Sequence, residues 1–255
     1  MPSFIIHEAC KQELVKRMNI KGDDKQMVIA NLLPDAISEV DETLPYEERR
    51  RLIQTQKINT HFRTDINKVY QYPNVKLIKE KYLDLIKTDI VSFFCYFHLY
   101  TDYIYFTRYL PKCAMPINGN MKETLTRENI KYIRINKSNE LVPISDFWGK
   151  EGKNAIYVEY IRATKQLLKD YPFNYTVEEL REYIKDHPVT TEMEEIVSSN
   201  PEFVFDILEG ILNDAKELKD NDLYIFNYED MISYIKETVT SFIEENEEIV
   251  NCYVK

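Results

Sequence analysis

Glycine is scarce in this chain, and its scarcity restricts the folds and functions open to the protein. Only 5 of the 255 residues are glycine. Loops that hold nucleotide phosphates need clustered glycines, and the chain contains neither a GxGxxG segment nor a GxxxxGK segment followed by Ser or Thr. The GxSxG segment of many serine hydrolases is absent as well. Few glycines also indicate few tight turns, so we expect mainly helices.

Apolar spacing supports a helical fold along most of the chain. Ile6, Cys10 and Leu14 recur at helical intervals, for example. Turn-forming residues gather in the middle, where we expect a small hairpin over 131–136 and 141–144. The prediction is a single all-α domain over 1–255, with an irregular middle at 111–150 and C-terminal helices over 151–255. The predicted helices cover 3–18, 24–33, 46–54, 73–86, 89–110 (closed by Pro111), 153–170, 176–186, 190–198, 201–219 and 228–248, with a loop over 59–72.

Charge and cysteine content narrow the function and location further. The net charge is −10, which makes nucleic acid unsuitable as the main partner because a phosphate backbone attracts basic proteins. The four cysteines form no CxxC pair and are expected to be reduced thiols in a cytoplasmic protein. No signal peptide is expected at the N-terminus. The apolar stretch 90–106 contains His98 and Asp102 and is predicted as a buried core helix, not as a transmembrane segment.

His98 and Asp102 are the first candidate site residues. They are four positions apart in the segment FHLYTD, so on a helix they share one face. A buried carboxylate needs partners or a cation, and a histidine with a carboxylate at this spacing forms half of a metal site. A simple hydrogen bond between the two side chains in the core is the alternative interpretation.

Three further residues in the first 110 positions add metal-binding groups. They are His7 in the first helix, Asp35 in the segment NLLPDA, and His61 in the segment THFRTD. Each has an ordinary interpretation as well: a core or surface histidine, a helix cap and a solvated loop residue. Together with His98 and Asp102 they supply three imidazoles and two carboxylates, which suit one or two zinc-like ions. We therefore expect residues 1–110 to form a metal-site half.

In this order the residues resemble the zinc-dependent phospholipase C family, and in particular its intracellular bacterial members. The likeness comes from MPS before His7, NLLPDA, THFR, QYP at 71–73 and HLYTD, and continues more weakly through AIYVEYIRATKQLL at 155–168. It implies that Asp35, His61, His98 and Asp102 bind one metal, and that His7 binds a neighbouring metal with Asp102 as a bridge. It also implies an all-α fold of the phospholipase C/nuclease type and hydrolysis of a small-molecule phosphate ester by a metal-activated water.

The chain also departs from that family. Secreted members have a further histidine after the HxxxD helix and then an HxxxE pair, whereas the only later histidine here is His187, with Thr191 four residues on. A third metal therefore has no obvious histidine ligands, and one or two ions are expected. Glu159 is a speculative candidate for a missing ligand.

Further candidate roles fall to one metal ligand, Asp35, and to two residues outside the ligand set, Arg63 and Trp148. Asp35 is the candidate for ligand and general base together. Arg63 follows His61 by two residues, so in an extended loop both side chains point the same way and Arg63 could bind the substrate phosphate. A surface salt bridge is the alternative for Arg63. Trp148, beside two of the five glycines, is a candidate for a loop over a cleft.

Two rival functions were considered. The helical HD-type phosphohydrolases need adjacent His and Asp, and the four histidines here are followed by Glu8, Phe62, Leu99 and Pro188. The second rival is a non-catalytic helical protein with a structural metal site or with none, since four ligands can close a zinc site completely. The donor set does not distinguish zinc from manganese or iron.

Overall fold

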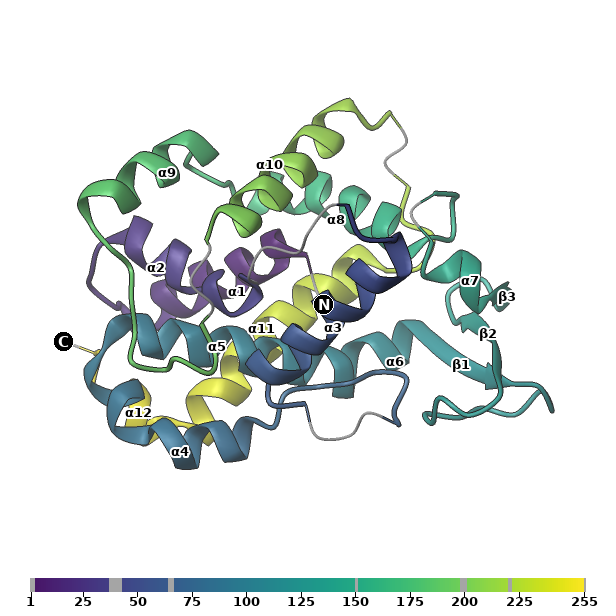
Figure 1. Ribbon diagram of the computed structural model, residues 1–255, viewed down its shortest axis with the longest axis horizontal. Helices are drawn as coiled ribbons and strands as arrows, with labels where there is room; N and C mark the ends of the chain where they lie inside the picture. Colours follow the sequence, from purple (N-terminus) through teal and green to yellow (C-terminus); the bar gives the residue numbers. More distant parts are fainter. Residues whose placement is uncertain are drawn as a thin grey trace.

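The computed structural model describes residues 3–36, 43–63, 67–149, 151–197, 201–219 and 222–254. These residues form a mostly helical structure with one small sheet (Figure 1). The N-terminal elements are α1 (Phe4–Met18), α2 (Asp24–Ala30), the 3-10 turn η1 (Leu33–Asp35), α3 (Tyr46–Thr60), α4 (Val75–Thr88) and α5 (Ile90–Ile104). A π-helical turn η2 (Tyr105–Tyr109), α6 (Leu110–Cys113), β1 (Ala114–Asn118), β2 (Ile130–Ile135), β3 (Glu140–Pro143) and α7 (Ile144–Phe147) follow. The C-terminal helices are α8 (Ile156–Asp170), α9 (Val177–Asp186), α10 (Glu202–Glu217), α11 (Tyr228–Glu245) and α12 (Glu247–Val250).

Helix α5 is the central element. It begins at Asp89, whose carboxylate accepts hydrogen bonds from the backbone N–H groups of Val91 and Ser92. Almost all of its residues are buried, because α1, α2, α4, α11 and η1 pack around it. The predicted core helix is therefore confirmed, and it holds His98 and Asp102 in the interior.

The predicted end of this helix at Pro111 is wrong. The helical path continues from α5 through η2 into α6. Pro111 lies in the first turn of α6, where the backbone N–H that proline lacks is not needed. The π-helical turn begins three residues after Asp102, and such turns are frequent near functional sites.

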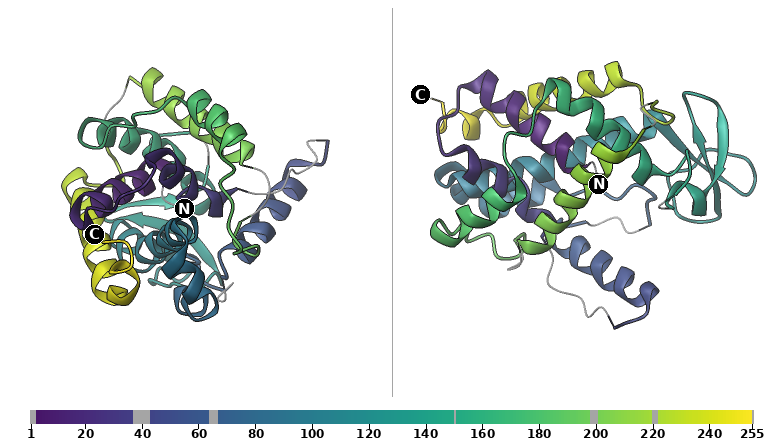
Figure 2. Two further views of the ribbon diagram at one scale, coloured as in Figure 1. Left: turned by 90° about the vertical axis from the view of Figure 1, so that its left-hand side faces the viewer. Right: turned by 90° about the horizontal axis from the view of Figure 1, so that it is seen from above.

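The sheet corrects the all-α prediction in part. The expected hairpin is confirmed, since β2 and β3 pair antiparallel with Ile133 opposite Val142. A third strand, β1, pairs antiparallel with β2 and places Pro116 opposite Ile133. We did not predict β1, because its sequence AMPIN has no alternation and contains a proline. The sheet lies at one end of the molecule, away from most of the helices (Figures 1 and 2).

Several helix boundaries differ from the prediction. Helix α3 runs to Thr60, so His61 caps a helix and does not lie inside a loop. The region 190–197 contains turns in place of the predicted helix. The capping box of α9, in which Thr176 and Glu179 exchange hydrogen bonds, is confirmed. Helix α3 lies at the margin of the helical body in both views of Figure 2. Across the described ranges, every helix is too short or too polar to span a bilayer.

Candidate metal centre

Five predicted site residues lie together in the interior. His7 comes from the first turn of α1, Asp35 from η1 and His61 from the C-terminal end of α3, while His98 and Asp102 lie one turn apart on α5. Each is no more than 1% exposed. Elements far apart in the sequence thus bring three imidazoles and two carboxylates to one place.

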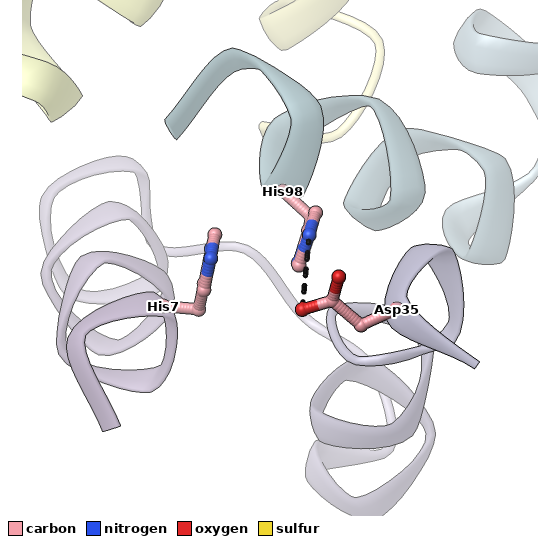
Figure 3. Close-up of side chains that lie close together, drawn as sticks. All are labelled: His7, Asp35 and His98. Atoms are coloured by element: carbon pink, nitrogen blue, oxygen red, sulfur yellow. Dashed lines mark ion pairs between the residues drawn. The ribbon is translucent and has the colours of Figure 1, made fainter. Parts of the chain in front are cut away.

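The five side chains form a closed ring in the order His61, Asp35, His98, His7 and Asp102, which we call the His/Asp ring. His61 Nε2 lies 3.3 Å from Asp35 Oδ1 and 3.5 Å from Asp102 Oδ2. The second oxygen of each carboxylate faces another histidine. Asp102 Oδ1 lies 3.4 Å from His7 Nε2, and Asp35 Oδ2 lies 3.7 Å from His98 Nε2. The rings of His7 and His98 stack with centroids 3.9 Å apart, which closes the circle (Figure 3).

These distances are longer than those of strong hydrogen bonds between charged groups, which are about 2.7–2.9 Å. The Nε2 atoms of the three histidines, both oxygens of Asp102 and Oδ2 of Asp35 are buried without a hydrogen-bond partner. Ligands held about 2.0–2.2 Å from a tetrahedral zinc ion lie about 3.3–3.6 Å from one another. The ring spacing matches metal ligands better than it matches a hydrogen-bonded core. Two groups have donor atoms that all lie within 4.8 Å of one another: His7, Asp35 and His98, and His61, His98 and Asp102.

The protonation of His98 is fixed by a backbone carbonyl. His98 Nδ1 lies 2.7 Å from the carbonyl oxygen of Asn31, which can only accept a hydrogen bond. Nδ1 must therefore carry the hydrogen, and Nε2 presents a lone pair to the ring. Burial, together with nearby His7, lowers the pKa of His98 to about 3, so the imidazole is neutral near pH 7. A neutral imidazole oriented in this way is the usual form of a metal ligand.

The other two histidines differ in what contacts them from outside the ring. Nδ1 of His7 is buried without a hydrogen-bond partner in the described structure. His61 Nδ1 lies 2.9 Å from the hydroxyl oxygen of Thr60, and burial lowers the pKa of His61. The side-chain amide of Asn31 donates to the backbone carbonyl of His7 over 3.0 Å, which ties α1 to the end of α2. Asn31 thus contacts two ring residues, one through its backbone and one through its side chain.

Both carboxylates of the ring are held in the ionised form. Burial alone would raise the pKa of Asp35, but Lys57, His98 and His61 outweigh it and keep that pKa well below its usual range. Burial likewise acts to raise the pKa of Asp102, and His7 contributes most to lowering it below the usual value. Two ionised carboxylates beside the lone pair of His98 Nε2 form an arrangement that a cation would stabilise.

Two cationic side chains flank the ring. Arg63 Nη2 lies 3.8 Å from Asp102 Oδ2, and the guanidinium also lies over the ring of Phe106. Lys57 Nζ lies 3.4 Å from Asp35 Oδ1. Arg63 thus lies beside the ring, but not through the predicted extended loop, because His61 ends α3 and Phe62 has a φ of 50°. Its binding of a substrate phosphate stays a prediction. Sequence reasoning missed Lys57, although it precedes His61 by four residues and therefore shares a face of α3 with it.

Glu159 does not belong to the His/Asp ring. Its carboxylate accepts hydrogen bonds from the backbone N–H groups of Tyr224, Ile225 and Phe226 at 2.7–3.1 Å, and Arg162 Nη1 lies 3.4 Å away. These partners engage both oxygens, so the suggestion that Glu159 completes the metal site is wrong.

Two other residues lie elsewhere in the structure. Trp148 packs against the rings of Tyr70 and Phe147 beside the sheet, and its role over a cleft stays a prediction. His187 is exposed at the end of α9, where it stacks on Tyr183, so it supplies no ligand to the ring.

No protein-family model, curated protein or solved structure matches this chain. The interpretation of the site therefore depends on its own geometry and on the motif resemblance.

Proposed function

We propose that the protein is a metal-dependent hydrolase of phosphate esters that binds one or two zinc-like ions in the His/Asp ring. One observation carries the proposal: carboxylate oxygens and imidazole nitrogens face each other at 3.3–3.7 Å without hydrogen bonds. Since His98 Nε2 has no hydrogen, it and Asp35 Oδ2 present lone pairs to each other. That contact is repulsive unless a cation lies between them.

The metal ion, Asp35 and Arg63 would each have a separate role in the hydrolysis. A bound zinc-like ion would make hydroxide available from water near neutral pH and would offset charge on the phosphoryl group. Asp35 is the candidate to accept a proton from an attacking water, since its Oδ2 is buried without a hydrogen-bond partner in the described structure. Arg63 can donate hydrogen bonds to the substrate phosphate, because its Nε and Nη2 atoms have no hydrogen-bond partner within the described part of the chain.

The resemblance to the zinc-dependent phospholipase C family supports the same assignment. In that resemblance Asp102 bridges two metals, with His7 on one of them. The two oxygens of Asp102 here face different histidines, Oδ1 toward His7 and Oδ2 toward His61. Each oxygen is thus available to a different ion, which favours the two-metal form of the proposal.

A structural metal site is the second candidate. The observation in its favour is burial, because every ring residue is at most 1% exposed. A catalytic site keeps a ligand position open to water, whereas a structural site is closed by protein ligands. Metal binding without hydrolysis would support this candidate.

The test is metal content followed by activity. Elemental analysis of protein purified without a histidine tag is expected to find one or two zinc-like ions per chain, retained in His187→Ala and lost in His98→Ala. Hydrolysis of p-nitrophenyl phosphate or bis-p-nitrophenyl phosphate is expected to follow the same pattern. His187→Ala is a matched control, because it removes an exposed histidine outside the ring. Absence of metal in all three proteins, with no uptake on titration, would overturn the proposal.

A further inference from the structure

Lys57 and Arg63 differ from the ring residues in their exposure. Their side chains are 15% and 13% exposed, whereas the ring residues are almost completely buried. Both come from one short segment, at the end of α3 and just beyond it. They therefore mark a rim between the His/Asp ring and solvent, on the side of the molecule where α3 lies (Figure 2).

Once a metal is bound, the positive charges at this rim outnumber the negative ones. Among the described side chains at the rim, the carboxylates of Asp35 and Asp102 face the two cations Lys57 and Arg63, and Arg127 adds a further positive charge near Arg63. Each divalent ion adds two positive charges, so the loaded site has an excess of at least two. A partly buried excess of this kind attracts an anion of equal and opposite charge.

The hydrogen-bonding groups of the rim point to the same type of ligand. Arg63 Nε and Nη2 are buried without a hydrogen-bond partner within the described ranges, although Nη2 lies 3.8 Å from Asp102 Oδ2. Both N–H groups can therefore donate to an oxyanion. Lys57 contacts Asp35 at 3.4 Å, a long distance for a strong ion pair. A metal ion on Asp35 would weaken that contact further by repelling the ammonium group.

We infer that Lys57 and Arg63 form an anion clamp that makes the site selective for phosphate monoesters, which are dianions, over the monoanionic diesters. The inference rests on the proposed function and names its substrate class. A monoester offers three unsubstituted oxygens, enough for both clamp residues and the metal, whereas a diester offers two. In the hydrolysis, the oxygen of water bonds to phosphorus and the ester P–O bond breaks. The bond electrons leave with the alcohol oxygen, which takes the proton that water gives up.

The first experiment measures binding of inorganic phosphate to the zinc-loaded protein by calorimetry. We expect Lys57→Met and Arg63→Met each to weaken phosphate binding about tenfold or more, as for loss of one charge-assisted hydrogen bond, while metal content is unchanged. Lys57→Arg should retain most of the affinity, because it keeps the charge. The matched control is Lys79→Met, which removes a part-buried lysine paired with Glu248 at 3.3 Å on another surface.

The second experiment compares kcat/KM for p-nitrophenyl phosphate and bis-p-nitrophenyl phosphate. The wild type should prefer the monoester, and the two methionine variants should lose that preference. Unchanged phosphate binding in both variants, or a preference of the wild type for the diester, would overturn the inference while leaving the metal site intact. Failure of the protein to bind metal would overturn the proposed function and this inference with it.

Discussion

Glu159 and Asp102 are two completely buried carboxylates with opposite surroundings. Glu159 is fully buried, and its oxygens accept three backbone hydrogen bonds from residues 224–226. Asp102 is equally buried, yet neither of its oxygens has a hydrogen-bond donor in the described structure. Its near neighbours are imidazole nitrogens at 3.4–3.5 Å and the guanidinium of Arg63.

Glu159 has the surroundings of a structural carboxylate, and Asp102 has those of a ligand-binding one. A buried ion without partners is costly, and Glu159 avoids that cost with donors from its own chain. The His/Asp ring leaves its lone pairs exposed to one another in the interior. Both side chains are completely buried carboxylates, so the completeness of hydrogen bonding is the property that distinguishes them.

The largest predicted effect is stabilisation of the His/Asp ring by metal. If zinc binds the folded chain alone, free zinc at about a thousand times its Kd should raise the free energy of unfolding by about 4 kcal/mol. Urea unfolding with zinc and with a chelator measures this difference. His98→Ala should abolish it, whereas His187→Ala should preserve it. An equal free energy of unfolding in zinc and in chelator would show that zinc does not stabilise the His/Asp ring. The ring and the Glu159 site would then not differ in metal binding.

The next effect concerns the Glu159 site. Glu159→Gln removes the charge that three backbone N–H groups face, so we expect the free energy of unfolding to fall by about 2–3 kcal/mol. The decrease should be the same with zinc and with chelator, and metal content should be unchanged. A change in metal affinity in this variant would show that the two sites are linked and that Glu159 is more than structural.

The sequence predicted the parts of the site that depend on local spacing. His98 and Asp102 share a face because they are four residues apart on an apolar helix, and the structure places them so. His7, Asp35 and His61 come from three other elements. No periodicity connects them, and they were suggested only by their residue types and by the family resemblance.

The rest could not be predicted for identifiable reasons. Asn31 orients His98 through a backbone carbonyl, and every residue has one. Lys57 had a usable signal in its spacing from His61, but α3 was predicted to end before both residues. Glu159 was mistaken for a ligand because a sequence shows that a carboxylate lies on an apolar helix, not whether backbone N–H groups meet it. Two prolines gave wrong predictions of secondary structure: Pro111 lies within a continuing helical path, and Pro116 lies in a strand.

The smallest predicted effect tests whether the His/Asp ring is held in place from outside. Asn31→Ala keeps the carbonyl that accepts from His98 Nδ1 but removes the amide that donates to the His7 carbonyl. His7 should then be less well positioned, and zinc affinity should fall about tenfold, the lower end of the effect of residues that orient metal ligands. Competition with a chromophoric zinc chelator measures the change.

A matched variant separates positioning from a general loss of stability. Asn246 is also buried and also donates its amide to a backbone carbonyl, that of Phe242, at 3.1 Å. Asn246→Ala should destabilise the fold by more than the roughly 1 kcal/mol expected for Asn31→Ala, because Asn246 also accepts a hydrogen bond from the Tyr96 hydroxyl at 3.1 Å. It should nevertheless leave zinc affinity unchanged. If the two variants weaken zinc binding equally, the effect reports loosening of the whole core. If only Asn31→Ala weakens it, the contact between α2 and α1 sets the ring geometry, because Asn246→Ala removes at least as many buried hydrogen bonds from the core.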